Sequence, residues 1–263
     1  MHDMIKIFKY QIRDVLRSRL VIFYFLFFLL FTSLIFHFTS EPSGVIANIL
    51  SINVSFVPLL TLLHGTTFYY NSKGYILFML TQPVRRINLV TGIWFGVSIP
   101  LVLAQFLGIL IPFLLFSDIT MALAAPLGSL LVTGAFITFI FLAIAFLIAI
   151  FQDDKAKGFG LSLSLWFLLA LLYDGIILAI SIYFADWPLE LPLLIISSFN
   201  PIDLARIFCL IHLDSAALMG YTGAIFQEYF QSATGTIISA FALCLWTVLP
   251  LSAALLKFNR KDF

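Results

Sequence analysis

Six long apolar runs limit what this chain can fold into. They cover residues 20–38, 45–69, 87–116, 126–151, 159–184 and 234–256. A helix needs about 20 mostly apolar residues to cross the hydrocarbon core of a bilayer. Because every backbone polar group must be satisfied there, a helix is the default form of such a run. The sequence therefore predicts an all-α membrane protein with six transmembrane helices.

The amino-acid composition also indicates that the chain lies in a lipid bilayer. Hydrophobic residues make up 62% of the 263 residues and charged residues only 10%, where soluble domains carry about 25% charged residues. The net charge of +1 gives no indication of a nucleic-acid partner. Cys209 and Cys244 lie 35 residues apart and form neither a disulfide framework nor a C-x-x-C motif. Membrane lipids are the expected surroundings.

Lysine and arginine predict the orientation. Thirteen of the 14 basic residues fall before the first run, between the second and third, between the fourth and fifth, or after the last. Only Arg206 falls on the other side. The positive-inside rule then places both termini in the cytoplasm.

The N-terminal residues 1–19 are expected to form an elbow helix in the membrane interface. One face of residues 3–17 is apolar and the other carries Lys6, Lys9, Arg13 and Arg17, as in amphipathic interfacial helices. The apolar face comprises Ile5, Phe8, Ile12, Val15 and Leu16. An ordinary extension of the first span is the alternative. A cleaved signal peptide is disfavoured, because the apolar run is too long and no small-x-small site follows it.

Residues 70–86 form a second element on this side. Tyr75 to Leu80 is an apolar run too short to cross the bilayer. Pro83 disfavours helical geometry at Gln82, so the chain is expected to turn there. The pattern predicts a short helix parallel to the membrane, with a loop held by positive charges as the alternative. A tail, residues 257–263, completes this face.

An elbow helix, six spans and a short helix ending in L-x-x-P-[small/apolar]-x-R resemble the ABC-2 type permeases. In that family the short helix is the coupling helix, which docks on a separate ATPase subunit. The resemblance implies one ABC-2 transmembrane domain over residues 1–263 and an ATPase dimer that binds ATP and magnesium. The implied coupling residues are Gly74, Leu80, Thr81, Gln82, Pro83, Arg85 and Arg86. Ser72, Lys73 and Ile93 depart from charges that the family often carries nearby.

A narrower resemblance lies in the second half. The blocks GLSLSLWFLLALLYDG (160–175), NPIDLAR (200–206) and SAALMGY (215–221) are similar to permeases of the transporters that mature nitrous oxide reductase in denitrification. This resemblance implies a permease homodimer beneath a periplasmic β-helical protein. That protein receives copper from a chaperone and serves the copper centres of the reductase. Copper would sit on these partners, and this chain would hold no cofactor.

The external segment, residues 185–233, is expected to be helical and to dock the periplasmic subunit. Asn200 can cap a helix, Pro201 suits its first position, and Asp203 in the first turn can pair with Arg206. Residues 191–199 are expected to pack on the outer ends of the spans. A self-contained lid without a partner is the alternative.

Asp174 is the one acid well inside a predicted span. Ionisable residues at this depth are functional candidates because burying their charge is costly. Its partner could be a neighbouring subunit or the polar stripe of Asn48, Ser51 and Ser55 on the second span. It could instead serve a proton relay or reach the outer headgroups.

The sequence contains no recognisable catalytic or metal-binding motif. The chain lacks the P-loop pattern G-x-x-x-x-G-K-[ST]. An intramembrane serine protease using Ser162 or Ser164 would lack the G-x-S-x-G elbow and a histidine in the later spans. His37, His212, Met121 and Met219 share no copper-ligand spacing. Two functions remain, a permease for copper-site maturation and an ABC-2 exporter of lipid, drug or polysaccharide.

Overall fold

The computed structural model describes residues 2–39, 41–118, 120–184, 190–211, 213 and 233–261. Within these ranges, six helices are long and apolar enough to cross a membrane. The predicted all-α class and six spans are therefore confirmed. The spans are α2 (Arg19–Phe38), α3 (Pro42–Asn71), α5 (Arg86–Phe116), α6 (Met121–Phe151), α7 (Lys155–Phe167) continued through the π-turn η1 (Leu168–Leu172) into α8 (Tyr173–Tyr183), and α12 (Ala233–Asn259).

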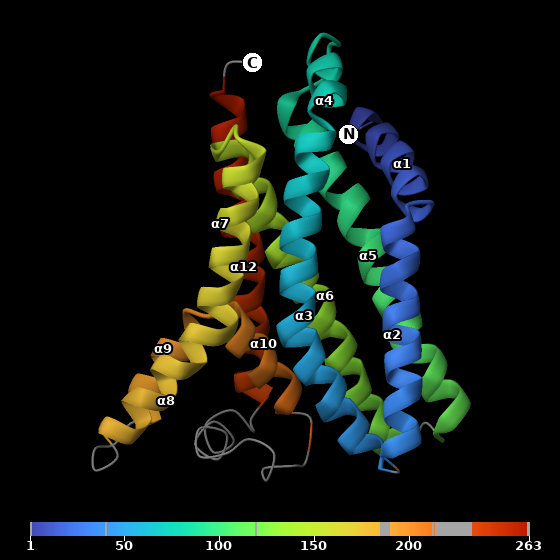
Figure 1. Cartoon of the computed structure of the whole chain (residues 1–263), viewed down its shortest axis with the longest axis vertical. Helices are drawn as coiled ribbons and strands as arrows, with labels where there is room; N and C mark the ends of the chain where they lie inside the picture. Colours follow the sequence, from blue (N-terminus) through green and yellow to red (C-terminus); the bar gives the residue numbers. More distant parts are fainter. Residues whose placement is uncertain are drawn as a thin grey trace.

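Shorter helices lie at the two ends of the bundle. α1 (His2–Leu16) and α4 (Lys73–Leu80) lie at the end that also carries both chain termini, which we call the terminal face (Figure 1). α9 (Glu190–Ser198) and α10 (Pro201–Leu210) lie toward the opposite face. The segments that carry the 13 grouped basic residues all meet at the terminal face, as the sequence predicts.

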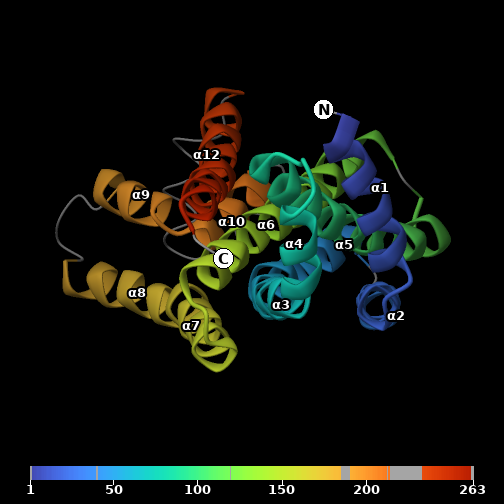
Figure 2. The same ribbon diagram turned by 90° about the horizontal axis from the view of Figure 1, so that it is seen from above.

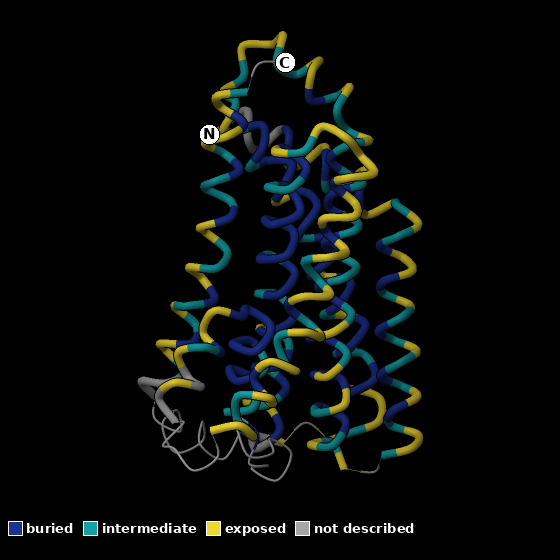
Figure 3. The backbone as a smooth tube through the Cα atoms, turned by 60° about the vertical axis from the view of Figure 1, so that its left-hand side comes forward, coloured by how far each residue is buried: buried dark blue, intermediate teal, exposed yellow. Residues whose placement is uncertain are grey.

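α6 is the central helix, because it contacts α3, α5, α7, α10 and α12 (Figure 2). Buried backbone concentrates in this interior (Figure 3). Polar side chains also join the helices there. Gln105 Nε2 of α5 donates to Asn53 Oδ1 of α3 at 2.9 Å, and Thr138 Oγ1 of α6 donates to Gln105 Oε1 at 3.4 Å. Such interhelical hydrogen bonds hold bundles together where apolar contact alone has no driving force.

The N-terminal helix forms as predicted, but its buried face is different. Ile7, Gln11 and Val15, at spacing four, are buried against the bundle, whereas Leu16 is exposed. α1 packs on α5, where Gly96 gives Gln11 room. Lys9, Arg13 and Arg17 are exposed on the other side. The interfacial elbow role stays a prediction.

α9 and α10 form a hairpin in which α10 packs inside the bundle, against α3, α6 and α12, while α9 lies at its edge beside α8. Asn200, at the tip, donates from Nδ2 to the carbonyl oxygen of Leu169 at 2.9 Å. Leu169 lies 14 residues from each end of the span Lys155–Tyr183, so the tip is level with its middle. Ile196 of α9 packs on Ile177 and Tyr173 of α8, the outer half of its span. The expectation that residues 191–199 pack on the outer helix ends therefore holds in part, and only the tip reaches further inward. Residues 185–189, 212 and 214–232 of the external segment, including His212, Met219 and the block 215–221, fall outside the described residues.

Gly108 allows a close contact between α2 and α5. A Cβ on Gly108 would lie 2.7 Å from Phe28 Cβ and 2.9 Å from the Phe25 carbonyl oxygen. We expect Gly108→Ala to force α2 away and to cost about 1–2 kcal/mol of stability, as overpacked cores do. Gly175→Ala is the matched control, since a Cβ there meets nothing within 4 Å. Thermal unfolding in detergent checks this. Equal or higher stability of Gly108→Ala would contradict the packing argument.

Candidate functional site

The residues that the resemblance assigns to coupling surround α4. Gly74, Thr81, Gln82, Pro83 and Arg85 are exposed or partly exposed, and Leu80 is partly buried. Beside them Phe78 is 62% exposed and Leu77 39% exposed, although they belong to a helix with Ile76 buried beneath. The chain thus presents an apolar tip with a polar rim at the terminal face. This is the arrangement expected of a surface that binds another protein.

The Arg86 guanidinium binds backbone carbonyl oxygens of this chain. Nη1 lies 3.3, 3.1 and 2.9 Å from the carbonyl oxygens of Phe258, Asn259 and Lys261. The last four carbonyls of a helix lack partners within that helix. Arg86, the first residue of α5, therefore caps the end of α12. Its assignment to ATPase contact stays a prediction, now beside a second role that the sequence did not indicate.

Asp153 joins three segments at the same face. Its Oδ1 accepts hydrogen bonds from Lys261 Nζ at 2.8 Å and from Lys73 Nζ at 3.4 Å. Lys261 Nζ also donates to the carbonyl oxygen of Ile150, near the end of α6, at 2.8 Å. The Asp153 carboxylate thereby connects the start of α4 to the ends of α6 and α12.

The loop between α6 and α7 binds the end of α3 as well. Tyr70 Oη donates to the carbonyl oxygen of Gln152 at 2.7 Å, and Lys155 Nζ donates to Asn71 Oδ1 at 3.0 Å. Asp154 caps α7 by accepting from the backbone of Ala156 at 2.8 Å. Sequence reasoning missed this loop. Its signal is an acidic pair, Asp153 and Asp154, directly before the basic residues Lys155 and Lys157.

Asn200 is the residue that fixes the hairpin tip. Its Oδ1 accepts from the Ile202 backbone at 3.1 Å, so the predicted cap of α10 with Pro201 next to it is confirmed. Its Nδ2 lies 2.9 Å from the Leu169 carbonyl of the π-turn and 3.1 Å from Asp203 Oδ2. Asn200, Pro201 and Asp203 are buried within this chain. These three side chains therefore pack inside this chain, and their part in docking a periplasmic subunit stays a prediction.

Arg206 holds two carboxylates. It lies 3.6 Å from Asp203 on its own helix, as the spacing of three predicts, and 3.1 Å from Asp174 on α8. Neither Asn48 nor the serines of α3 provide the partner of Asp174 that we expected. The pair is half-exposed, with 36% of the Arg206 side chain and 40% of the Asp174 side chain accessible. Asp174 lies nine residues inside the end of its span, roughly 14 Å along the helix.

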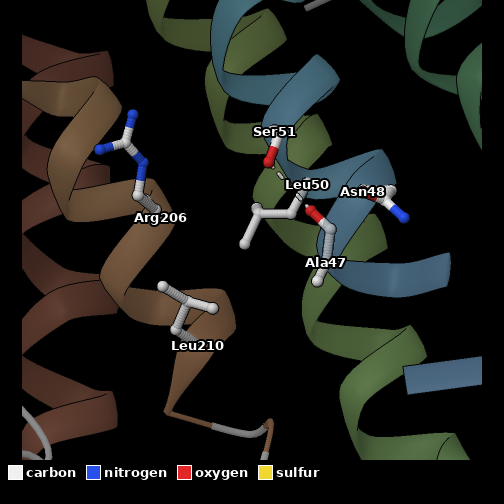
Figure 4. Close-up of a pocket in the computed structure, with 6 residues that line it drawn as sticks. All are labelled: Ala47, Asn48, Leu50, Ser51, Arg206 and Leu210. Carbon is white, nitrogen blue, oxygen red and sulfur yellow. Dashed lines mark hydrogen bonds between the residues drawn. The ribbon is translucent and has the colours of Figure 1, made fainter. Parts of the chain in front are cut away.

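A small pocket separates Arg206 from α3. Arg206 and Leu210 of α10 line one wall, and Ala47, Asn48, Leu50 and Ser51 of α3 line the other (Figure 4). Its volume is about 160 Å³, whereas small-molecule sites usually have about 300–1,000 Å³. Of the polar stripe on the second span, Asn48 and Ser51 are among the residues that line this small pocket.

Comparison with known protein families shows which family of membrane proteins this chain belongs to. The ABC-2 family transporter protein profile matches residues 71–263, well over half of the chain. This chain belongs to the ABC-2 transporter family. It is an ABC-2 permease, the membrane subunit of an ABC transporter, and relatives of this kind leave ATP hydrolysis to a separate subunit.

Two curated relatives carry the same description. One, from Pseudomonas aeruginosa, is named "Probable ABC transporter permease protein NosY" and is 30% identical over 237 residues, covering 85% of this chain and 82% of the relative. The other, with the same name, is from Stutzerimonas stutzeri. It is 27% identical over 179 residues, covering 65% of this chain and 64% of that relative.

Because Arg206 pairs with two carboxylates, we expect substitution of Arg206 and substitution of Asp174 to lower stability by different amounts. Arg206→Met would leave the buried Asp203 carboxylate without its cation, which should cost about 1–3 kcal/mol. Asp174→Asn should cost less, because Arg206 keeps Asp203 as a partner and Asn can still accept a hydrogen bond. Unfolding midpoints in detergent measure both. Equal loss in the two variants would show that Asp203 does not depend on Arg206.

Asp153 predicts a pH dependence at the terminal face. The hydrogen bond from Lys261, with the charges of Lys261 and Lys73, holds the pKa of the Asp153 carboxyl below its usual value. A depressed pKa means that the stabilisation is complete above the unfolded-state pKa, near 3.9, and is lost as pH falls through the folded pKa. Stability measured between pH 7 and pH 3 should therefore fall more for wild type than for Asp153→Asn. Parallel curves would refute this contribution.

Proposed function

We propose that this ABC-2 permease couples cytoplasmic ATP hydrolysis to the periplasmic maturation of the copper centres of nitrous oxide reductase. The observation that carries the proposal is the similarity to the NosY permease, which extends over 85% of this chain and 82% of that relative. A match of this length cannot be confined to one motif or to one end of the bundle. The proposal therefore concerns the whole transmembrane domain.

The terminal face is assigned to the cytoplasm of a bacterial inner membrane. Its 13 lysines and arginines support this orientation, since loops near spans are enriched in these residues on the cytoplasmic side. An ATPase dimer would then dock on α4. The exposed Phe78 supplies an apolar anchor, and Gly74, Thr81, Gln82, Pro83 and Arg85 supply the rim.

A permease homodimer is the second part of the proposal. The Arg206–Asp174 pair is half-exposed although Asp174 lies roughly 14 Å inside its span. Charged side chains at such depth face a bundle interior or a water-filled space and not lipid tails. A second copy of this chain would enclose that space, and α7 to α8, the least buried span, lies beside it.

The periplasmic partner is assigned to the opposite face. A β-helical copper-processing protein, served by a copper chaperone, would rest on the outer ends of the spans and of the hairpin. Asn200, Pro201, Asp203 and Arg206 would support this platform from inside, by holding α10 in place. No cofactor is assigned to this chain, and copper belongs to the partners.

An exporter of lipid, drug or polysaccharide is the alternative within the family. Its solute would need a continuous cavity, and the pocket beside Arg206 is about 160 Å³ in this chain. We favour the copper-maturation function over export because of the similarity to the NosY permease over 85% of this chain.

The test uses a denitrifying strain from which this chain has been deleted. We expect it to produce nitrous oxide reductase without its copper centres, and the wild-type chain to restore them. Phe78→Ala should reduce recovery of the ATPase subunit with the tagged permease at least about tenfold, the effect of losing an interface anchor worth roughly 1.4 kcal/mol or more. Copper loading should fall with it. Phe159→Ala, 43% exposed near the same face, is the matched control.

Two outcomes would oppose the proposal. Fully loaded reductase in the deletion strain would remove the copper-maturation function. Normal ATPase recovery with Phe78→Ala, or equal loss with Phe159→Ala, would remove α4 as the docking surface.

A further inference from the structure

The segment that contains α4 is fastened to the end of α12 at both of its ends. At its start, Lys73 reaches Asp153, and Asp153 in turn binds Lys261. At its finish, Arg86 binds the carbonyl oxygens of Phe258, Asn259 and Lys261. Residues 72–86 are thus a loop whose two anchor points converge on residues 258–261.

The convergence makes two helix ends depend on each other. Arg86 caps α12, and Lys261, which follows α12, donates to the Ile150 carbonyl of α6 at 2.8 Å. Cations at the C-terminal ends of helices gain both hydrogen bonds and a favourable interaction with the helix dipole. The Lys261 side chain is only 14% exposed and the Asp153 side chain 65% exposed, so water competes weakly with the bond to Ile150 and more strongly with the bond to Asp153. The ends of α6 and α12 are therefore held as one unit with the base of α4.

α12 carries this connection toward the opposite face. It packs along α6 and contacts α10. Trp246 Nε1 donates to the carbonyl oxygen of Ser198, at the end of α9, at 3.2 Å. α12 therefore contacts Arg86, at the end of the α4 segment, through its C-terminal carbonyls, and it contacts the α9–α10 hairpin through Trp246.

We propose that the C-terminal end of α12, residues 257–261, transmits movement of α4 to the bundle and the hairpin. Arg86, Asp153 and Lys261 are its positioning residues, and none of them needs to touch the ATPase. The inference rests on the proposed permease function and adds the internal route that this function requires. A purely structural role for these contacts would change stability alone.

The experiment uses the complete transporter, purified through a tag on this chain and placed in lipid nanodiscs. Lys261→Met removes the side-chain hydrogen bonds to Ile150 and Asp153, and Asp153→Asn keeps an acceptor but removes the charge at an exposed position. Arg260→Met is the matched control, because the exposed Arg260 side chain takes part in none of these contacts within the described residues. Lys261→Arg is the conservative variant, since it can still donate to Ile150 and Asp153.

Three quantities are measured: ATPase recovery, ATP hydrolysis, and the change in hydrogen exchange of residues 190–211 when vanadate traps the ATPase. In wild type and Arg260→Met we expect trapping to change the exchange of this hairpin. In Lys261→Met the ATPase should remain bound and hydrolyse ATP within about twofold of wild type, while the hairpin response falls at least about fivefold, within the range of coupling changes seen for such contacts. Asp153→Asn should show a smaller loss, and Lys261→Arg should recover the response.

The outcomes separate the two proposals. Failure of the wild-type chain to recover an ATPase would refute the proposed ATP-coupled function. A bound, active ATPase with a wild-type hairpin response in both Lys261→Met and Asp153→Asn would overturn the transmission role. If Lys261→Met does not fold, the response in the exposed Asp153→Asn variant decides alone.

Discussion

The carbonyl oxygens that end α6 and α12 need partners, and two cations from elsewhere in the chain supply them. Arg86 binds three carbonyls at the end of α12, and Lys261 binds Ile150 at the end of α6. Arg86 lies at the end of the segment that contains α4. Lys261 binds the Asp153 carboxylate, which also accepts a hydrogen bond from Lys73 at the start of α4. Because helix ends must be satisfied, the position of the short helix and the positions of two spans become a single arrangement.

Deep in the bundle, the same rule governs the hairpin. A π-turn rearranges the hydrogen bonds of a span and often marks a functional position, and here the Leu169 carbonyl takes the amide of Asn200. Arg206 then joins α10 to α8 through Asp174. The hairpin is thus bound to its preceding span by polar contacts and to α12 by Trp246. Such a hairpin is suited to follow the spans as they move.

The features that the sequence predicts well are local ones. The six spans follow from hydropathy over single segments, and the cap by Asn200 with Pro201 follows from neighbouring residues. The Asp203–Arg206 pair follows from helical spacing. The partner of Asp174, 32 residues away, and the carbonyls bound by Arg86, more than 170 residues away, depend on how distant helices pack. Composition and periodicity carry no record of that packing. The depth of the hairpin was missed for the same reason, since an apolar nine-residue helix fits either place.

The central claim is that α4, the end of α6 and the end of α12 move as one body. Structures of the assembled transporter without nucleotide and with vanadate-trapped nucleotide test it most directly. The account predicts that the Arg86–Asn259 and Lys261–Asp153 contacts persist in both states while this body shifts relative to α2 and α8. Contacts that are present in one state and broken in the other would contradict it.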